Sequence, residues 1–100
     1  MHMPRMSHQR LKILNRFLER PEAELSGADL VALTSIASGS LYPLLLGLQK
    51  QGLLKGRWEA GDPRSLGRPL RRLYRLTPSG RRAAEAANAD LLGNLLTSKS

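Results

Sequence analysis

The sequence contains no cysteine, and histidine is almost absent. Without cysteine, neither a disulfide nor a cysteine-ligated zinc ion can stabilise the chain, and a cytoplasmic protein is the simpler interpretation. The two histidines, His2 and His8, have no carboxylate close by in sequence, so we expect no metal site and no cofactor. No apolar run approaches the roughly 18 residues that a membrane span requires, and no signal peptide precedes the first expected helix.

Acidic residues are also scarce, and their distribution argues against an enzyme. The chain has eight Asp and Glu residues, spread without pairing. General acid–base and nucleophilic catalysis need titratable groups that orient one another, and no such set is visible in the sequence. We therefore expect a protein that binds a partner, not one that catalyses a reaction.

Basic residues are plentiful and concentrated in one third of the chain. Ten of the 16 Lys and Arg residues lie between Lys50 and Arg82, where only Glu59 and Asp62 oppose them, so this segment carries the whole net charge of +8. A localised positive field of this kind attracts a polyanion. The alternative is a solvated β-hairpin whose charges keep its edges from aggregating.

Three helices are expected before this basic segment. Ser7 is placed to cap a helix that runs to about Arg20 and stops at Pro21. The run Ser26–Asp29 has the form of a capping box that opens a second helix over residues 27–33. A tight turn follows, and the order helix, turn, helix indicates a helix-turn-helix unit.

The third helix, residues 38–51, is expected to begin with Ser38 as its N-cap and to end before Gly52. Leucines recur along it at positions 41, 44, 45 and 48, which is the spacing of one buried face of a helix. The opposite face, which includes Ser40, Tyr42 and Pro43, has no apolar reason to be buried.

A β-hairpin is expected next. Alternation from Leu54 places Lys55, Arg57 and Glu59 on one side of a strand, with Trp58 on the other side, where we expect it to pack the hairpin onto the core. Residues 61–69 form a loop rich in proline and glycine. Residues 70–77 are expected to form the return strand.

The last helix is expected over residues 78–97, with Thr77 as its cap and Pro78 at its first position. Its apolar stripe is wider than a small domain needs to cover, so we expect a homodimerisation helix, with packing on its own domain as the alternative. A domain of 100 residues buries a modest core and often depends on a partner. The predicted dimerisation residues are Leu11, Leu14, Ala83, Ala87, Leu91 and Leu95.

This order of elements predicts a mainly α fold with a small β-hairpin: a winged helix-turn-helix domain over residues 7–77 plus a C-terminal dimerisation helix. The sequence also resembles the PadR-like transcriptional regulators. The resemblance rests on Ser38–Leu45, Trp58-Glu59, Gly67-Arg68-Pro69 and Tyr74–Gly80, in the right order and spacing. The chain resembles the short subclass, which has a single C-terminal helix.

The resemblance implies sequence-specific binding of double-stranded DNA, often as a repressor. Because one domain with so small a contact set would bind weakly, we expect a twofold homodimer on a near-palindromic operator. Helix 38–51 would enter the major groove, and the wing loop, residues 61–69, would lie at the minor groove. Gly47 stands where the family often has a basic residue. The candidate DNA-binding residues are Ser38, Ser40, Tyr42, Pro43, Lys50, Lys55, Arg64, Arg68 and Arg71.

Two other binding functions remain open at this point. A winged helix can bind an acidic protein through its basic wing, and a small basic protein can bind DNA without sequence preference as an architectural factor. The resemblance also permits control by a small-molecule effector. With four aromatic residues in all, and none in the last helix, few groups are available to stack on a flat ligand at a dimer seam.

Overall fold

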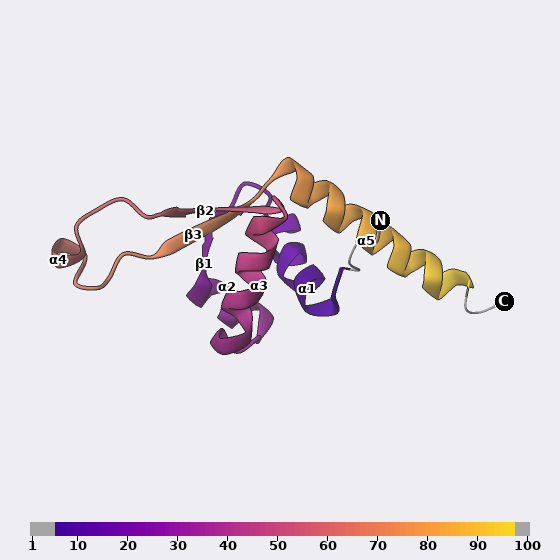
Figure 1. The fold of residues 1–100 in the computed structure, drawn as a ribbon, viewed down its shortest axis with the longest axis horizontal. Helices are drawn as coiled ribbons and strands as arrows, with labels where there is room; N and C mark the ends of the chain where they lie inside the picture. Colours follow the sequence, from indigo (N-terminus) through magenta and orange to yellow (C-terminus); the bar gives the residue numbers. More distant parts are fainter. Residues whose placement is uncertain (1–5, 98–100) are drawn as a thin grey trace.

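The computed structural model describes residues 6–97, in which five helices and three short strands follow one another along the chain; His2 lies outside these residues. Figure 1 shows their arrangement. The elements are α1 (His8–Leu18), β1 (Leu25–Ser26), α2 (Gly27–Thr34), α3 (Ser38–Lys50), β2 (Leu54–Trp58), α4 (Pro63–Leu66), β3 (Arg72–Leu76) and α5 (Pro78–Thr97).

The core lies between α1, α2, α3 and the first turns of α5, under one face of the sheet. Its fully buried side chains come from every one of these helices, so the three-helix unit and α5 fold around one apolar centre. Burial of aliphatic side chains is the main stabilising contribution in a domain of this kind. The core includes Ile13, Leu14, Phe17, Leu30, Leu41, Leu45, Leu48 and Ala84.

The sheet is antiparallel, with β3 in the centre, β1 on one side and β2 on the other. Register pairs Leu54 with Leu76 at the core end and Trp58 with Arg72 at the far end. Directly paired residues share a face of the sheet, so Trp58 and Arg72 lie on the same face as the buried Leu54 and Tyr74. That face is the one that α3 covers.

The molecule is elongated, with principal extents of 60 × 27 × 24 Å. In Figure 1 the wing (residues 54–76) projects from one end of the core, and the second half of α5 projects from the other end. The start of α5 is held by its cap, because the amide of Gly80 donates to the hydroxyl of Thr77 at 2.9 Å. Further along, the amides of Asn15 and Asn88 exchange two hydrogen bonds, which join α5 to α1.

Several helix ends form at the residues that were predicted from the local sequence. Ser7 caps α1, and Ser26 and Asp29 form both hydrogen bonds of a capping box at α2. Gly52 adopts a φ of +73° directly after α3, as a C′ glycine should. The N-cap of α3 is Ala37, however, and not Ser38, because the backbone already turns helical at Ser38 and no side chain caps this end.

Two short elements were not predicted. β1 contains only two residues, and α4 is one turn of helix inside the predicted loop. Within residues 6–97, no single helix is long and apolar enough to cross a membrane; α2 and α3 reach that composition only as a pair bent by 114°.

Candidate nucleic-acid interface

The outward face of α3 is exposed along its whole length. Leu41, Leu45 and Leu48 are buried in the core, and the side chains on the other side of the helix face solvent. The exposed set contains the predicted residues together with two others, and consists of Ser38, Gly39, Ser40, Tyr42, Pro43, Leu46 and Lys50. The structure thus presents the predicted α3 residues on one continuous surface.

Tyr42 is fixed against the start of α2 although it is 49 % exposed. A Cβ atom added to Gly27 would lie 2.3 Å from the phenol oxygen of Tyr42, so the ring occupies the space that a side chain at position 27 would need. The absence of that side chain lets the two helices of the helix-turn-helix unit hold the phenol in one place.

A groove of about 450 Å³ separates the α2–α3 unit from the return limb of the wing (residues 68–72), and we call it the helix–wing groove. Tyr42 and the first residues of α2 form one wall, and the return limb with Trp58 forms the other. The basic limb and α3 therefore border one concave surface. The groove is lined by Ser26, Gly27, Ala28, Tyr42, Trp58, Arg68, Pro69, Leu70, Arg71 and Arg72.

Trp58 was predicted to pack onto the core, but the structure leaves it 61 % exposed. The guanidinium carbon of Arg72 lies 5.5 Å from the centre of its ring, which is within the range of a cation–π contact. The same guanidinium donates to the side-chain oxygen of Gln49 at 3.4 Å, over Gly56. Arg72 is thereby held between the wing and α3 in the helix–wing groove.

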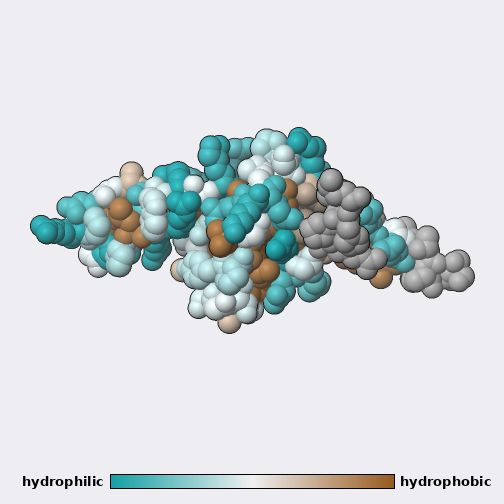
Figure 2. Space-filling model, in the orientation of Figure 1, coloured by the Kyte–Doolittle hydropathy of each residue, from teal (hydrophilic) through white to brown (hydrophobic). Residues whose placement is uncertain are grey.

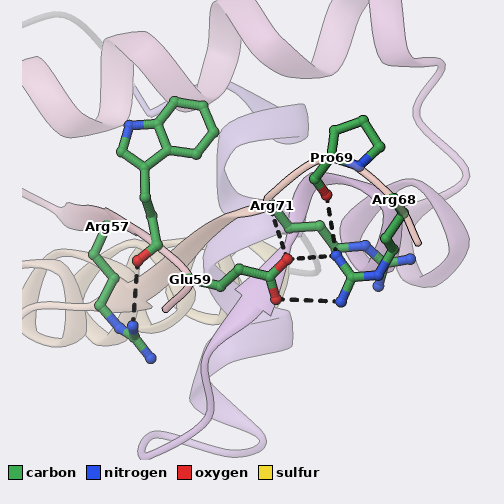
Figure 3. Close-up of polar contacts among 6 residues, drawn as sticks. Arg57, Glu59, Arg68, Pro69 and Arg71 are labelled. Atoms are coloured by element: carbon green, nitrogen blue, oxygen red, sulfur yellow. Dashed lines mark hydrogen bonds and ion pairs between the residues drawn. The ribbon is translucent and has the colours of Figure 1, made fainter. Parts of the chain in front are cut away.

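Glu59 connects the two limbs of the wing (Figure 3). It accepts hydrogen bonds from two nitrogens of the Arg68 guanidinium and, at 2.8 Å, from the backbone amide of Arg71. The hydrogen bond from Arg68 is the main cause that lowers the pKa of Glu59. Arg68, predicted as a minor-groove side chain, is thus engaged in an ion pair at the base of the wing loop.

Arg64 lies at the tip of the wing, as predicted, in the single turn of α4. Asp62 caps this turn by accepting from the amide of Arg64 at 3.0 Å. In Figure 2 the wing surface is mostly hydrophilic, with one apolar area near the tip. Leu66, the last residue of α4, is 43 % exposed. Arg64 is therefore a cation at the far end of a braced hairpin.

Lys55, one of the predicted DNA-binding residues, lies on the face of the sheet opposite α3. It pairs in register with Arg75, and alternation puts Arg57 on this same face. Arg57 forms a two-point ion pair with Glu24, at 2.5 and 2.7 Å, and this contact lowers the pKa of Glu24. Lys55 is thus separated from the helix–wing groove by the sheet itself.

Arg10 of α1 extends across the flank of α3 at Gly47. A Cβ atom at Gly47 would lie 2.7 Å from a guanidinium nitrogen of Arg10, and another of its nitrogens donates to the side-chain oxygen of Gln51 at 2.9 Å. Gly47 therefore leaves room for a cation that comes from a different helix. Sequence spacing could not reveal this contact, because the two residues lie far apart in the chain.

The predicted dimerisation residues separate into buried and exposed sets. Leu14 is fully buried in the core of one chain, so the prediction that it lies at a dimer interface is wrong. Leu11 and Ala83 pack partly against the same core, and Ala87 is half-buried. Towards the end of α5, Leu91 and Leu95 are 51 % and 57 % exposed, as is Leu92 at 58 %.

The sequence model of the transcriptional regulator PadR-like family matches residues 27–86, which is more than half of the chain. This stretch includes α2, α3, the wing and the start of α5, so it contains every residue that lines the helix–wing groove except Ser26. A comparison with curated protein sequences found no match.

Solved structures confirm the winged-helix fold. A mutant of S. aureus MepR is 21 % identical with a TM-score of 0.71, over 94 % of this chain and 66 % of that one. Bacillus subtilis PadR in complex with operator DNA is 24 % identical with a TM-score of 0.62, over 77 % and 45 %. Bordetella bronchiseptica BpsR, whose DNA binding is regulated by 6-hydroxynicotinic acid, is 20 % identical with a TM-score of 0.72, over 96 % and 67 %. The chain spans just under two thirds of the length of MepR.

Proposed function

Because this chain belongs to the PadR-like family of transcriptional regulators, we propose that it binds double-stranded DNA sequence-specifically as a homodimer and acts as a repressor. The observation that supports this most is the helix–wing groove, in which Tyr42 of α3 and the basic return limb face one another. A duplex that enters its major groove on α3 meets the wing at the adjacent backbone and minor groove.

Within this arrangement the side chains divide into two roles. Ser38, Ser40, Tyr42 and Pro43 belong to the part of α3 that reaches base edges. Cations around them, of which Lys50 is one, hold the phosphates and set the register without reading sequence. The cations assigned to phosphate or minor-groove contacts are Arg10, Lys50, Arg64, Arg71 and Arg72.

Dimerisation is assigned to the second half of α5. Leu91, Leu92 and Leu95 are each more than half exposed, and exposed leucines so close together favour burial against a second copy. Two copies related by a twofold axis would place their α3 helices roughly 34 Å apart, which is one turn of B-DNA. Such spacing fits a near-palindromic operator.

Control by a small molecule is a second proposal, with narrower support. Tyr42 and Trp58, two of the four aromatic residues, line the helix–wing groove together with Arg71 and Arg72. A planar aromatic anion bound there would compete directly with DNA. Titration with benzoate and hydroxypyridine carboxylates tests this: quenching of Trp58 fluorescence together with release of bound DNA supports it, and no response to any of them contradicts it.

The main proposal is tested by selecting bound duplexes from a random pool. We expect an enriched, near-palindromic sequence that binds at least roughly tenfold more tightly than random DNA at physiological salt. The slope of log K for DNA binding against log salt concentration should be about −0.9 per phosphate contacted, for roughly 6–8 phosphates. Equal affinity for all sequences would favour an architectural protein, and indifference to DNA would favour a protein partner for the wing.

A further inference from the structure

The central part of α3 carries no charge. From Ser38 to Gln49 the sequence contains no Lys, Arg, Asp or Glu, and Lys50 is the first cation of the helix. The exposed face of this part of α3 carries apolar side chains. Tyr42 is 49 % exposed and Leu46, one turn later, is 52 % exposed.

Leu46 lies in the middle of the outward face. Gly39, Pro43, Leu46 and Lys50 follow one another at steps of four, three and four residues, which forms a single stripe along a helix. All four are exposed, whereas Leu45 and its buried neighbours lie on the other side. An added Cβ at Gly39 would meet nothing within 4 Å, so the first turn of this stripe carries no side chain.

This composition matches one type of base edge better than the others. Guanine is most often read by the two donors of Arg, or by Lys, and adenine by the amide of Asn or Gln, whereas the methyl group of thymine is read by apolar contact. α3 offers no Arg, its one Lys is Lys50 at the last position of the helix, and its amide at Gln49 contacts Arg72 and the carbonyl of Leu45.

We propose that Leu46, supported by Tyr42, contacts thymine methyl groups in the major groove, and that the operator half-sites are therefore A·T-rich where α3 lies. This inference rests on the proposed DNA binding and specifies its target. It makes Leu46 a specificity-determining residue that contributes contact area and no hydrogen bond.

The experiment uses the full chain and the duplex enriched by selection. Each thymine is replaced in turn by deoxyuridine, which removes only the methyl group, and affinity is measured by fluorescence anisotropy. Loss of one buried methyl should weaken binding about three- to fivefold at one or two positions in each half-site. In the Leu46→Ala variant, at least one of these positions should become insensitive to deoxyuridine. The Leu33→Ala variant, which changes an exposed leucine of α2, should keep the full sensitivity.

Different results overturn different statements. If selected duplexes bind but tolerate deoxyuridine at every position, or if the half-sites prove to be G·C-rich, the thymine inference is wrong and DNA binding stands. If Leu46→Ala leaves the pattern of sensitivity unchanged, the assignment to Leu46 is wrong. If no duplex is enriched at all, the proposed function fails and this inference fails with it. Circular dichroism of Leu46→Ala should match the wild type, because the side chain is exposed.

Discussion

Arg68 and Glu59 are bound to each other through two nitrogens and two oxygens, and this ion pair ties the return limb of the wing to the end of β2. The amide of Arg71 donates to the same carboxylate. A hairpin that projects away from the core has few apolar contacts to hold it, so this pair adds to the backbone pairing of β2 with β3 in fixing the limb. Arg68 is a bracing residue, whereas Arg71 and Arg72 line the groove, where Arg72 is held by Trp58 and Gln49.

The brace should respond to acid. The pKa of Glu59 is lowered from 4.5 by the hydrogen bond from Arg68, so the carboxylate stabilises the folded wing above pH 4.5, and this contribution is lost as pH falls through the lowered pKa. A carbon-detected NMR titration should show that the pKa of Glu59 is below 4.5 in the wild type and higher in Arg68→Ala than in the wild type, because only Arg71 then still lowers it. The same value in both proteins would mean that the ion pair does not form in solution.

Gly80 is predicted to be intolerant of any side chain. A Cβ there would lie 2.0 Å from the carbonyl oxygen of Leu53, a backbone atom that cannot move aside cheaply. Gly80→Ala should lower the free energy of unfolding by about 1–3 kcal/mol. Gly93→Ala is the matched control in the same helix: its Cβ would meet nothing within 4 Å, and helix propensity should raise stability by about 1 kcal/mol.

Urea unfolding at one fixed protein concentration measures both glycine variants, since dimer formation would make stability depend on concentration. A Gly80→Ala protein as stable as Gly93→Ala would contradict the close approach of α5 to Leu53.

Arg10 is predicted to supply the positive charge that α3 lacks at Gly47. Arg10→Ala should weaken binding to all duplexes by a similar factor and should reduce the salt slope by about 1, as expected for a lost phosphate contact. Adding Gly47→Arg to this variant should restore much of the affinity, because it returns a guanidinium to the same flank. Anisotropy titrations at several salt concentrations measure the affinity of both variants for DNA. If the double variant binds no more tightly than Arg10→Ala, a guanidinium at position 47 cannot replace that of Arg10.

The dimer seam is predicted to lie at the exposed leucines of α5. Leu91→Glu with Leu92→Glu should give a monomer at micromolar concentration, because two carboxylates cannot be buried without partners. Leu33→Glu changes a similarly exposed leucine in α2 and should leave the dimer intact. Sedimentation velocity distinguishes these outcomes. A wild-type protein that sediments as a monomer would remove this part of the proposal.

Sequence reasoning succeeded where the signal is local. The capping box at Ser26 and Asp29, the cap at Thr77 and the glycine stop at Gly52 depend on residues close together in the chain, and all three formed as predicted. The leucine stripe placed the buried face of α3 correctly for the same reason.

Contacts across the chain were harder to predict. The sequence does not predict the ion pair of Arg68 with Glu59 or the contact of Arg10 with Gly47, because such contacts depend on how elements that are far apart in the chain pack together. Lys55 is a different case, since alternation along β2 already separated it from the side of Trp58. Trp58 was assigned to the core by its residue type, but it lies beyond the last core residue of the sheet, where Arg72 stacks over its ring.

The most direct test of the DNA-binding surface compares two arginines of β3. Arg72 lies in the helix–wing groove, and Arg75, three residues later, lies on the far face beside Lys55. Each alanine variant removes one positive charge, so any difference between them reflects position and not net charge. Measured by anisotropy on the selected duplex, Arg72→Ala should weaken binding by roughly tenfold or more and Arg75→Ala by less than about twofold. Equal losses, or a larger loss at Arg75, would show that DNA does not dock in this groove.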